Sequence, residues 1–166
     1  MSMPLLRNTK GFTIVELLIV IVVIAILAAI SIVAYNGVQT RANNSTVKSD
    51  LNKIIKKMEL AKIDLGRYPN TVAEIPSLGI SKGAWDQVEN NAYYCLNTDT
   101  GEYAFGARSK ARPQGYAVSS TRGLVELGSI YGETTCQLVG KSWGASGTFV
   151  AYAYNGPTAA WQGWAN

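Results

Sequence analysis

The sequence contains no histidine. This absence excludes Ser-His-Asp and Cys-His catalytic arrangements and every metal site with histidine ligands. The acidic residues between positions 86 and 133 form no recognisable catalytic signature. They are Asp86, Glu89, Asp99, Glu102, Glu126 and Glu133. We therefore expect a protein that is not an enzyme and that uses no cofactor.

Charge is missing from a long stretch near the N-terminus. Between Leu17 and Ala34 the only polar residue is Ser31. About 20 apolar residues are needed to span roughly 30 Å of hydrocarbon, and residues 12–35 supply that length. A secretory signal peptide would have a shorter apolar core that ends at a small-x-small cleavage site. Residues 25–29 could imitate such a site, but the apolar run continues beyond them. The sequence therefore predicts a transmembrane helix over residues 12–35.

The charges around this run predict its orientation. Arg7 and Lys10 precede it without any acid, and no basic residue follows it until Arg41. Basic residues are retained on the cytoplasmic side of a membrane. We therefore expect a single-pass protein of the cytoplasmic (inner) membrane, with its N-terminus in the cytoplasm and the rest of the chain outside.

One carboxylate, Glu16, stands where the apolar run begins. A charged side chain within a bilayer costs roughly 2.5–3.5 kcal/mol even on the lenient insertion scale, so it usually indicates a function. Glu16 ends the motif Lys10-Gly11-Phe12-Thr13-Ile14-Val15-Glu16. This motif, followed by a long Ile/Val/Leu run, resembles the class III leader of type IV pilins and their pseudopilin relatives.

The resemblance implies a processing pathway and a set of partners. Residues 1–11 would be a leader peptide that a prepilin peptidase removes by cutting after Gly11. Phe12 would then become the N-terminus and be N-methylated. Glu16 would pair with the terminal amine of a neighbouring subunit during assembly. The implied partners are further copies of the chain in a helical filament, the prepilin peptidase, the inner-membrane assembly platform, and membrane lipid before assembly.

The function that this resemblance implies is structural. We expect a subunit of a type IV pilus or pilus-like filament, extracellular after assembly, that serves motility, adhesion or DNA uptake. One alternative is a pseudopilin of a type II secretion or competence system. Another is a minor pilin that binds DNA or a surface, although a net charge of +4 is too small to predict nucleic-acid binding.

Residues 36–166 are expected to form one globular head that includes the second half of a long helix. After a polar stretch, apolar residues recur with steps of three and four, at Val47, Leu51, Ile54, Met58, Ala61 and Leu65. Charged residues, among them Lys53 and Asp50, are assigned to the opposite face. Gly66 can end the helix, and Gly66-Arg67-Tyr68-Pro69 resembles the G-x-Y-P element of pilins. Residues 36–45 are the weakest part, because Gly37 costs about 1 kcal/mol relative to alanine, and the sequence leaves a bend or local melting open there.

The remainder of the head has the pattern of short strands. Residues 70–92 predict a loop with short helical turns, and for residues 84–91 an amphipathic helix fits as well as a loop. Apolar runs separated by turn residues then predict an antiparallel meander over residues 92–96, 102–107 and 115–120. Two further runs, 124–127 and 148–154, are additional candidate strands. A long helix packed on such a sheet is an α+β fold, and it is also the fold that the pilin resemblance implies.

Cysteine is scarce, with only Cys95 and Cys136. The pair lacks the companions that a zinc site needs and forms no Cys-x-x-Cys motif. In an exported head it predicts a disulfide. This bond would close a loop of about 41 residues, which the chain-entropy model values at roughly 4 kcal/mol. The loop resembles the disulfide-bounded variable region of many pilins.

Two further patterns have competing interpretations. The run Asn97-x-Asp99-x-Gly101-Glu102 could be a fragment of a calcium loop, but a hairpin turn explains the same residues and is preferred. Basic residues lie near aromatic residues, which could form a DNA-uptake patch; they are Arg108, Lys110 and Arg112 beside Tyr103, Phe105 and Tyr116. The preferred interpretation is a solvated turn next to core aromatic residues.

Tryptophan is concentrated near the C-terminus, at Trp143, Trp161 and Trp164. Such residues usually complete a hydrophobic core. An exposed pair would instead indicate a contact between subunits or an adhesive surface.

Overall fold

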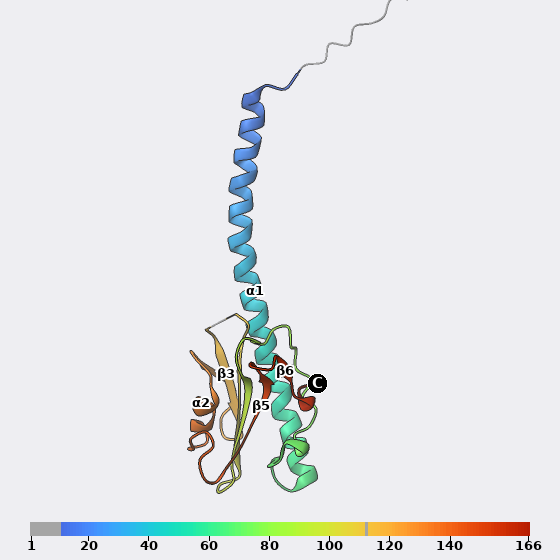
Figure 1. Cartoon of the computed structure of the whole chain (residues 1–166), viewed down its shortest axis with the longest axis vertical. Helices are drawn as coiled ribbons and strands as arrows, with labels where there is room; N and C mark the ends of the chain where they lie inside the picture. Colours follow the sequence, from blue (N-terminus) through green and yellow to red (C-terminus); the bar gives the residue numbers. More distant parts are fainter. Residues whose placement is uncertain (1–10, 112) are drawn as a thin grey trace, which may run out of the picture. The chain divides into compact units, whose positions relative to one another are not determined.

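The computed structural model describes residues 11–111 and 113–166. The chain falls into two units, one up to Val38 and the other from Gln39 to Asn166, which we call the head. Helix α1 (Ile14–Leu65) belongs to both units (Figure 1). The predicted long helix is confirmed, and residues 36–45 are helical throughout.

The first unit consists largely of the apolar part of α1. The most apolar stretch of this helix has a mean hydropathy of 3.4, and none of that stretch is buried. Its length and composition are sufficient to cross a membrane. The only polar residue of the run, Ser31, donates a hydrogen bond of 2.8 Å from Oγ to the Leu27 carbonyl, so its hydroxyl is satisfied within the helix.

The head contains one six-stranded sheet in the order β4-β3-β2-β1-β5-β6. All five strand pairs are antiparallel. The strands are β1 (Asn91–Asn97), β2 (Glu102–Arg108), β3 (Gly115–Ser119), β4 (Val125–Leu127), β5 (Thr148–Asn155) and β6 (Ala160–Trp161). The first three form the predicted meander, and β4 continues it. Strand β5, which was predicted as a strand without an assigned partner, pairs with the side of β1 that β2 leaves free.

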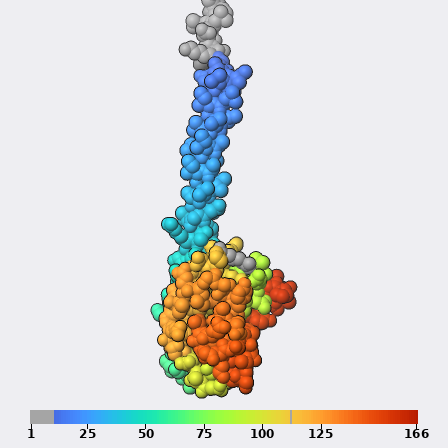
Figure 2. Space-filling model, turned by 90° about the vertical axis from the view of Figure 1, so that its left-hand side faces the viewer, coloured from blue at the N-terminus to red at the C-terminus, as the bar shows by residue number. Residues whose placement is uncertain are grey.

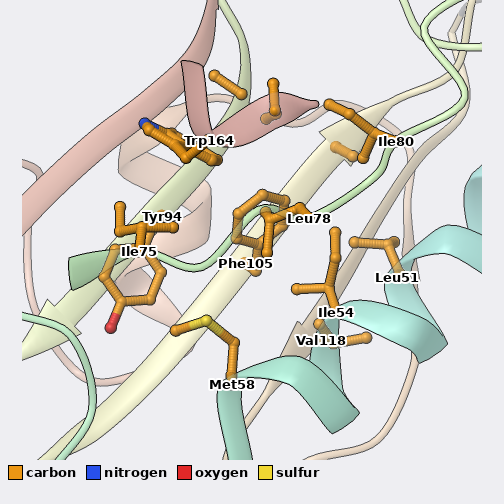
Figure 3. Packing of buried hydrophobic residues seen from close by; sticks show 14 of the residues in the cluster. Leu51, Ile54, Met58, Ile75, Leu78, Ile80, Tyr94, Phe105, Val118 and Trp164 are labelled. Carbon is orange, nitrogen blue, oxygen red and sulfur yellow. The ribbon is translucent and has the colours of Figure 1, made fainter. Parts of the chain in front are cut away.

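Elements on both faces cover the centre of the sheet. The second half of α1 packs its apolar stripe against one face, where Leu51, Ile54 and Met58 meet Phe105 and Val118 (Figure 3). A short helix that the sequence did not predict, α2 (Gly132–Gln137), lies against β1 and β2. Residues around α2, coloured orange, cover the sheet on that side (Figure 2). Every residue of β1 is therefore buried, on both sides of the strand.

The segment between α1 and β1 is held near its middle by the C-terminal residues. It contains a single turn of 3-10 helix, η1 (Val72–Glu74), and residues 84–90 form a loop, so the amphipathic-helix alternative is wrong. The Leu78 amide donates to the Trp164 carbonyl at 2.8 Å, and the Gly79 amide donates to the Asn166 carbonyl at 2.9 Å. The C-terminal residues, which include the 3-10 turn η2 (Gly163–Ala165), thereby close over this segment.

Candidate assembly site at the start of helix α1

Helix α1 begins with a reciprocal pair of side-chain caps. Thr13 donates two hydrogen bonds to Oε2 of Glu16, one from its backbone amide and one from its hydroxyl, each at 2.7 Å. The Glu16 amide in turn donates to the Thr13 hydroxyl oxygen at 3.2 Å. This is the capping box in which the third helical residue reaches back to the residue before the helix. Thr13 and Glu16 are therefore fixed relative to each other.

The cap uses only one of the two carboxylate oxygens of Glu16. Both donors of Thr13 converge on Oε2, and no hydrogen bond from the described residues reaches Oε1 of Glu16. The side chain is exposed in the single chain. A local cap and a role in assembly are compatible for Glu16, because they use different oxygens. Chemically, the free oxygen can accept a hydrogen bond from an ammonium group.

The residues at the expected cleavage point precede the helix. Gly11 and Phe12 have no regular secondary structure, and Phe12 is 84% exposed. Residues 1–10 of the expected leader lie outside the described residues. The Gly11–Phe12 bond is thus at the start of the described chain and is not held in a hydrogen-bonded turn of α1.

The apolar side chains after Glu16 have no partners in the single chain. Large apolar residues from Leu17 to Val38 are between 48% and 73% exposed. An exposed apolar surface of this extent indicates a membrane or protein contact. This surface can be covered either by lipid or by other polypeptide chains.

The two cysteines form a disulfide in the head, as the sequence predicted. Cys95 on β1 and Cys136 on α2 are joined, with a Cα–Cα distance of 5.3 Å. Both residues are fully buried, and Ala104 and Val139 pack around them. The bond ties α2 to the centre of the sheet.

The proposed calcium fragment is a hairpin turn, which was the preferred interpretation. Oδ1 of Asn97 accepts the amides of Asp99 at 3.0 Å and Thr100 at 3.3 Å. The Asp99 carboxylate pairs with Lys141 Nζ at 2.6 Å. Within the described ranges, no three residues of the types His, Cys, Asp and Glu are grouped as metal ligands.

The basic and aromatic residues do not form a solvent-facing patch. Arg108 is 4% exposed, and its guanidinium lies 3.0 Å from Asp86 Oδ2 and 2.8 Å from Glu89 Oε2. The nearby aromatic residues Tyr103, Phe105 and Tyr116 are buried in the core. The interpretation as a solvated turn is therefore wrong for Arg108, because two acids compensate its charge inside the head. Lys110 is exposed, and Arg112 lies outside the described residues.

The C-terminal tryptophans mainly complete the packing of the head. Trp164 is buried against Phe105, with ring centroids 6.2 Å apart. Trp143 and Trp161 are half-buried; the Trp143 ring makes an edge-to-face contact with Tyr93, and the Trp161 ring packs at a tilt against Tyr154. These residues therefore do not form an exposed pair.

One important residue of the head was assigned to the wrong face of the helix. Asp50 is 1% exposed and not on the solvent side with the lysines. Its carboxylate accepts the Ser81 amide at 2.7 Å and the Trp85 indole N–H at 3.0 Å, and it pairs with Lys53 at 3.2 Å. Its position three residues after Val47 and four before Ile54 follows the apolar stripe, and that spacing could have revealed it.

The G-x-Y-P element connects the end of α1 to the loop. Gly66 has a φ of +73°, the left-handed conformation that ends many helices. The buried Tyr68 hydroxyl donates to Glu59 at 2.7 Å, and burial is the main reason that the pKa of Tyr68 is raised. Arg67 binds Glu74 through both terminal guanidinium nitrogens, Nη1 and Nη2, and these hydrogen bonds are the main reason that the pKa of Glu74 is lowered to about 2.

Comparison with known proteins agrees with this arrangement. The prokaryotic N-terminal methylation motif matches residues 6–32. The type IV wide pilus major component PilA4 of Thermus thermophilus is 45% identical over 75 residues, which are 45% of this chain and 57% of that protein. The type II secretion system core protein G of Klebsiella pneumoniae is 28% identical over 85 residues, 51% of this chain and 61% of that protein.

Core protein G of Escherichia coli is 30% identical over 69 residues, 42% of this chain and 48% of that protein. The chain thus spans about half to three fifths of the length of these relatives. The comparisons confirm the resemblance to type IV pilins and pseudopilins, and the chain carries the N-terminal methylation motif of that family.

Proposed function

We propose that the chain is a structural subunit of a type IV pilus or pilus-like filament and that it polymerises through the first part of α1. The observation that carries this proposal is the apolar first part of α1, which has one capped carboxylate, Glu16, in its first turn and whose large apolar side chains up to Val38 are not covered by any other described residue. Lipid can surround this surface before assembly, and the helices of other copies can surround it afterwards. No catalytic role is part of this proposal.

Processing comes before assembly. A prepilin peptidase cuts between Gly11 and Phe12, and Phe12 is then N-methylated. This cut creates an ammonium group about one helical turn from Glu16. The N-terminus is cytoplasmic before assembly, the head is outside the inner membrane, and the filament forms at the assembly platform and extends to the cell surface.

The carboxylate of Glu16 selects the neighbouring subunit through its charge. In a bundle of apolar helices the dielectric is low, so an ammonium–carboxylate attraction is much stronger than it is in water. Oε2 stays with Thr13 of its own chain, and Oε1 receives the Phe12 amine of another copy. The same low dielectric makes a charge without a partner costly, so incorrectly placed subunits are disfavoured.

The test compares Glu16→Ala with Glu16→Gln. Glutamine can still accept the Thr13 donors in a capping box, but it carries no charge. If the charge drives assembly, both variants should accumulate in the membrane with a folded head and should form few or no surface filaments. Filaments at wild-type abundance in a Glu16→Gln strain, with no wild-type copy present, would refute the assembly role. A defect in Glu16→Ala alone would assign the residue to the cap.

The mature N-terminus provides a separate check. N-terminal sequencing or intact mass should show a methylated Phe12 as the first residue. A mature chain that begins at Met1 or beyond Ala25 would contradict the processing step.

The second candidate function is a pseudopilin of a type II secretion system. The similarity to core protein G of two species favours it, whereas the higher identity to a pilus component favours the pilus. Deletion of the gene that encodes this chain distinguishes the pilin from the pseudopilin function. Loss of surface filaments with normal protein secretion indicates a pilin, and loss of secretion indicates a pseudopilin.

A further inference from the structure

The head has an apolar groove where α1 ends. It has a volume of about 350 Å³ and lies between the last turns of the helix and the segment that follows η1; its lining includes Leu60, Leu65 and Pro76. Leu60 is 61% exposed and Leu65 is 41% exposed. Leucines on the solvent side of a polar helix are unusual when they lie together at a groove. The groove is therefore suited to an apolar side chain from another molecule.

One charge in this groove has no partner. Lys57 donates from Nζ to the Ser77 carbonyl at 2.7 Å, and Glu74 is held by Arg67. Asp64 also lines the groove; it is exposed, and no ion pair or hydrogen bond joins its side chain to another residue of the described chain. Lys57 is thus directed to the groove wall by a bond to a neutral carbonyl, and Asp64 is the carboxylate of the groove that is left without a partner among the described residues.

The turn between β3 and β4 carries an exposed leucine and an exposed positive charge. Leu124 is 38% exposed at its end. The backbone of the turn is fixed, because the Ser119 amide donates to the Arg122 carbonyl at 3.0 Å and the Arg122 amide donates to Ser119 Oγ at 2.9 Å. The Arg122 guanidinium is exposed and has no partner among the residues described. This turn therefore presents a leucine and a free positive charge on a rigid backbone.

The groove and the turn lie at the same end of the head. The end of α1 and the hairpin turn after β1 line one hollow, to which Gly66 and Gly101 contribute. The β3–β4 turn is next to the start of β2, since the Ser120 amide donates to the Tyr103 carbonyl at 2.9 Å. Both features are thus at the level of the β1–β2 hairpin turn.

They lie on opposite flanks at that end. The turn leads into β4, which is one edge of the sheet. The groove wall at Ser77 leads into Leu78, which is hydrogen-bonded to the C-terminal segment that follows β6, the other edge of the sheet. A contact between two different flanks of identical subunits is heterologous, and repetition of such a contact produces an open helical array unless it closes into a ring.

We propose that neighbouring heads bind side by side, with Leu124 of one copy in the groove of the next copy and Arg122 opposite Asp64. The occupant is a second copy of this chain, because its turn offers the complementary charge and apolar side chain at the same end of the head. This contact rests on the proposed function, and it supplies a specific head contact in addition to the bundle of helices.

Cross-linking in surface filaments tests the contact directly. Cells that produce one chain with Leu60→Cys and another with Leu124→Cys should yield a heterodimer when sheared filaments are treated with a short bifunctional thiol reagent. The matched control pairs Leu60→Cys with Val88→Cys, since Val88 is 73% exposed but lies outside both features. Filaments that form normally but give no heterodimer above the control would overturn the contact and leave the proposed function intact.

Charge reversal supplies a second test that needs no new cysteine. Asp64→Arg or Arg122→Asp alone should reduce filament yield severalfold, and the double variant should restore most of it. Lys110→Asp, which reverses an exposed charge elsewhere, should have no effect. Equal losses in the single and double variants would contradict the pairing. Absence of filaments from the wild-type chain, with Glu16 intact, would instead reject the proposed function and this contact with it.

Discussion

Helix α1 contains two kinds of apolar surface within one element. Up to Val38, apolar residues occupy all sides, and every large one among them is at least 48% exposed. In the head, a stripe of apolar residues faces the sheet, and Val47, Leu51, Ile54 and Met58 of this stripe are fully buried. The first part therefore depends on its surroundings for partners, whereas the second part finds them in its own chain.

This difference separates assembly from folding. A change in the first part should alter membrane insertion or polymerisation and leave the stability of the head unchanged. A change in the second part should alter the stability of the head. The predictions below use unfolding of the detergent-solubilised full chain in urea, followed through tryptophan fluorescence, because Trp85 and Trp164 are buried in the head.

The largest effect should come from the disulfide, which belongs to the head alone. Cys95→Ser combined with Cys136→Ser should lower the free energy of unfolding by about 4 kcal/mol, because the unfolded chain regains the freedom of a loop of roughly 41 residues. Membrane insertion should be unaffected. In the native protein, a thiol reagent should modify neither cysteine without prior reduction, and labelling of both would show that the bond is absent.

The same substitution at two places in α1 tests the comparison most directly. Ile54→Ala should cost about 2–5 kcal/mol of head stability, because it leaves a cavity in the core. Ile24→Ala is the matched control, and it should leave the urea transition of the head in place, since Ile24 is 59% exposed. A comparable loss in both variants would mean that the two units unfold together.

A smaller effect is expected at Asp50. Asp50→Asn should destabilise the head by about 1–3 kcal/mol. Oδ2 accepts both the Ser81 amide and the Trp85 indole N–H, and Oδ1 faces Lys53, so the amide nitrogen must either displace the acceptor of two buried donors or face a cation. Asp64→Asn, on the exposed side of the same helix, should change stability by less than about 0.5 kcal/mol. Equal urea midpoints for the two variants would show that the buried carboxylate does not stabilise the head.

The smallest expected effect is a pH dependence of head stability that comes from Glu74. Hydrogen bonds from Arg67 lower the pKa of Glu74 from 4.5 to about 2, so the ionised form favours the folded state. This contribution is present above pH 4.5 and is lost as the pH falls through about 2. Glu74→Gln should lack this part of the acid dependence, so the difference in urea midpoint between the two proteins should shrink as the pH is lowered over that range. A constant difference would contradict the prediction.

The local patterns of the sequence were sufficient for the principal elements. The apolar run, the stripe of Leu51, Ile54 and Met58, and the stop at Gly66 predicted α1 to its last residue. The four strands of the meander were predicted to within about two residues. These features depend on the side-chain periods of helices and strands, which a single segment displays by itself.

Other features were decided only by contacts between distant segments. Strand β5 pairs with β1 and not with β4, and Arg108 is neutralised by Asp86 and Glu89. The burial of Asp50 depends on Ser81 and Trp85, which are 31 and 35 residues away along the chain. A charged residue on a helix predicts a solvated face unless a donor from elsewhere approaches it. The sequence by itself thus determined which segments are helices and strands, while the tertiary structure decided which polar groups they bury, because burial of a charge requires partners that no local pattern contains.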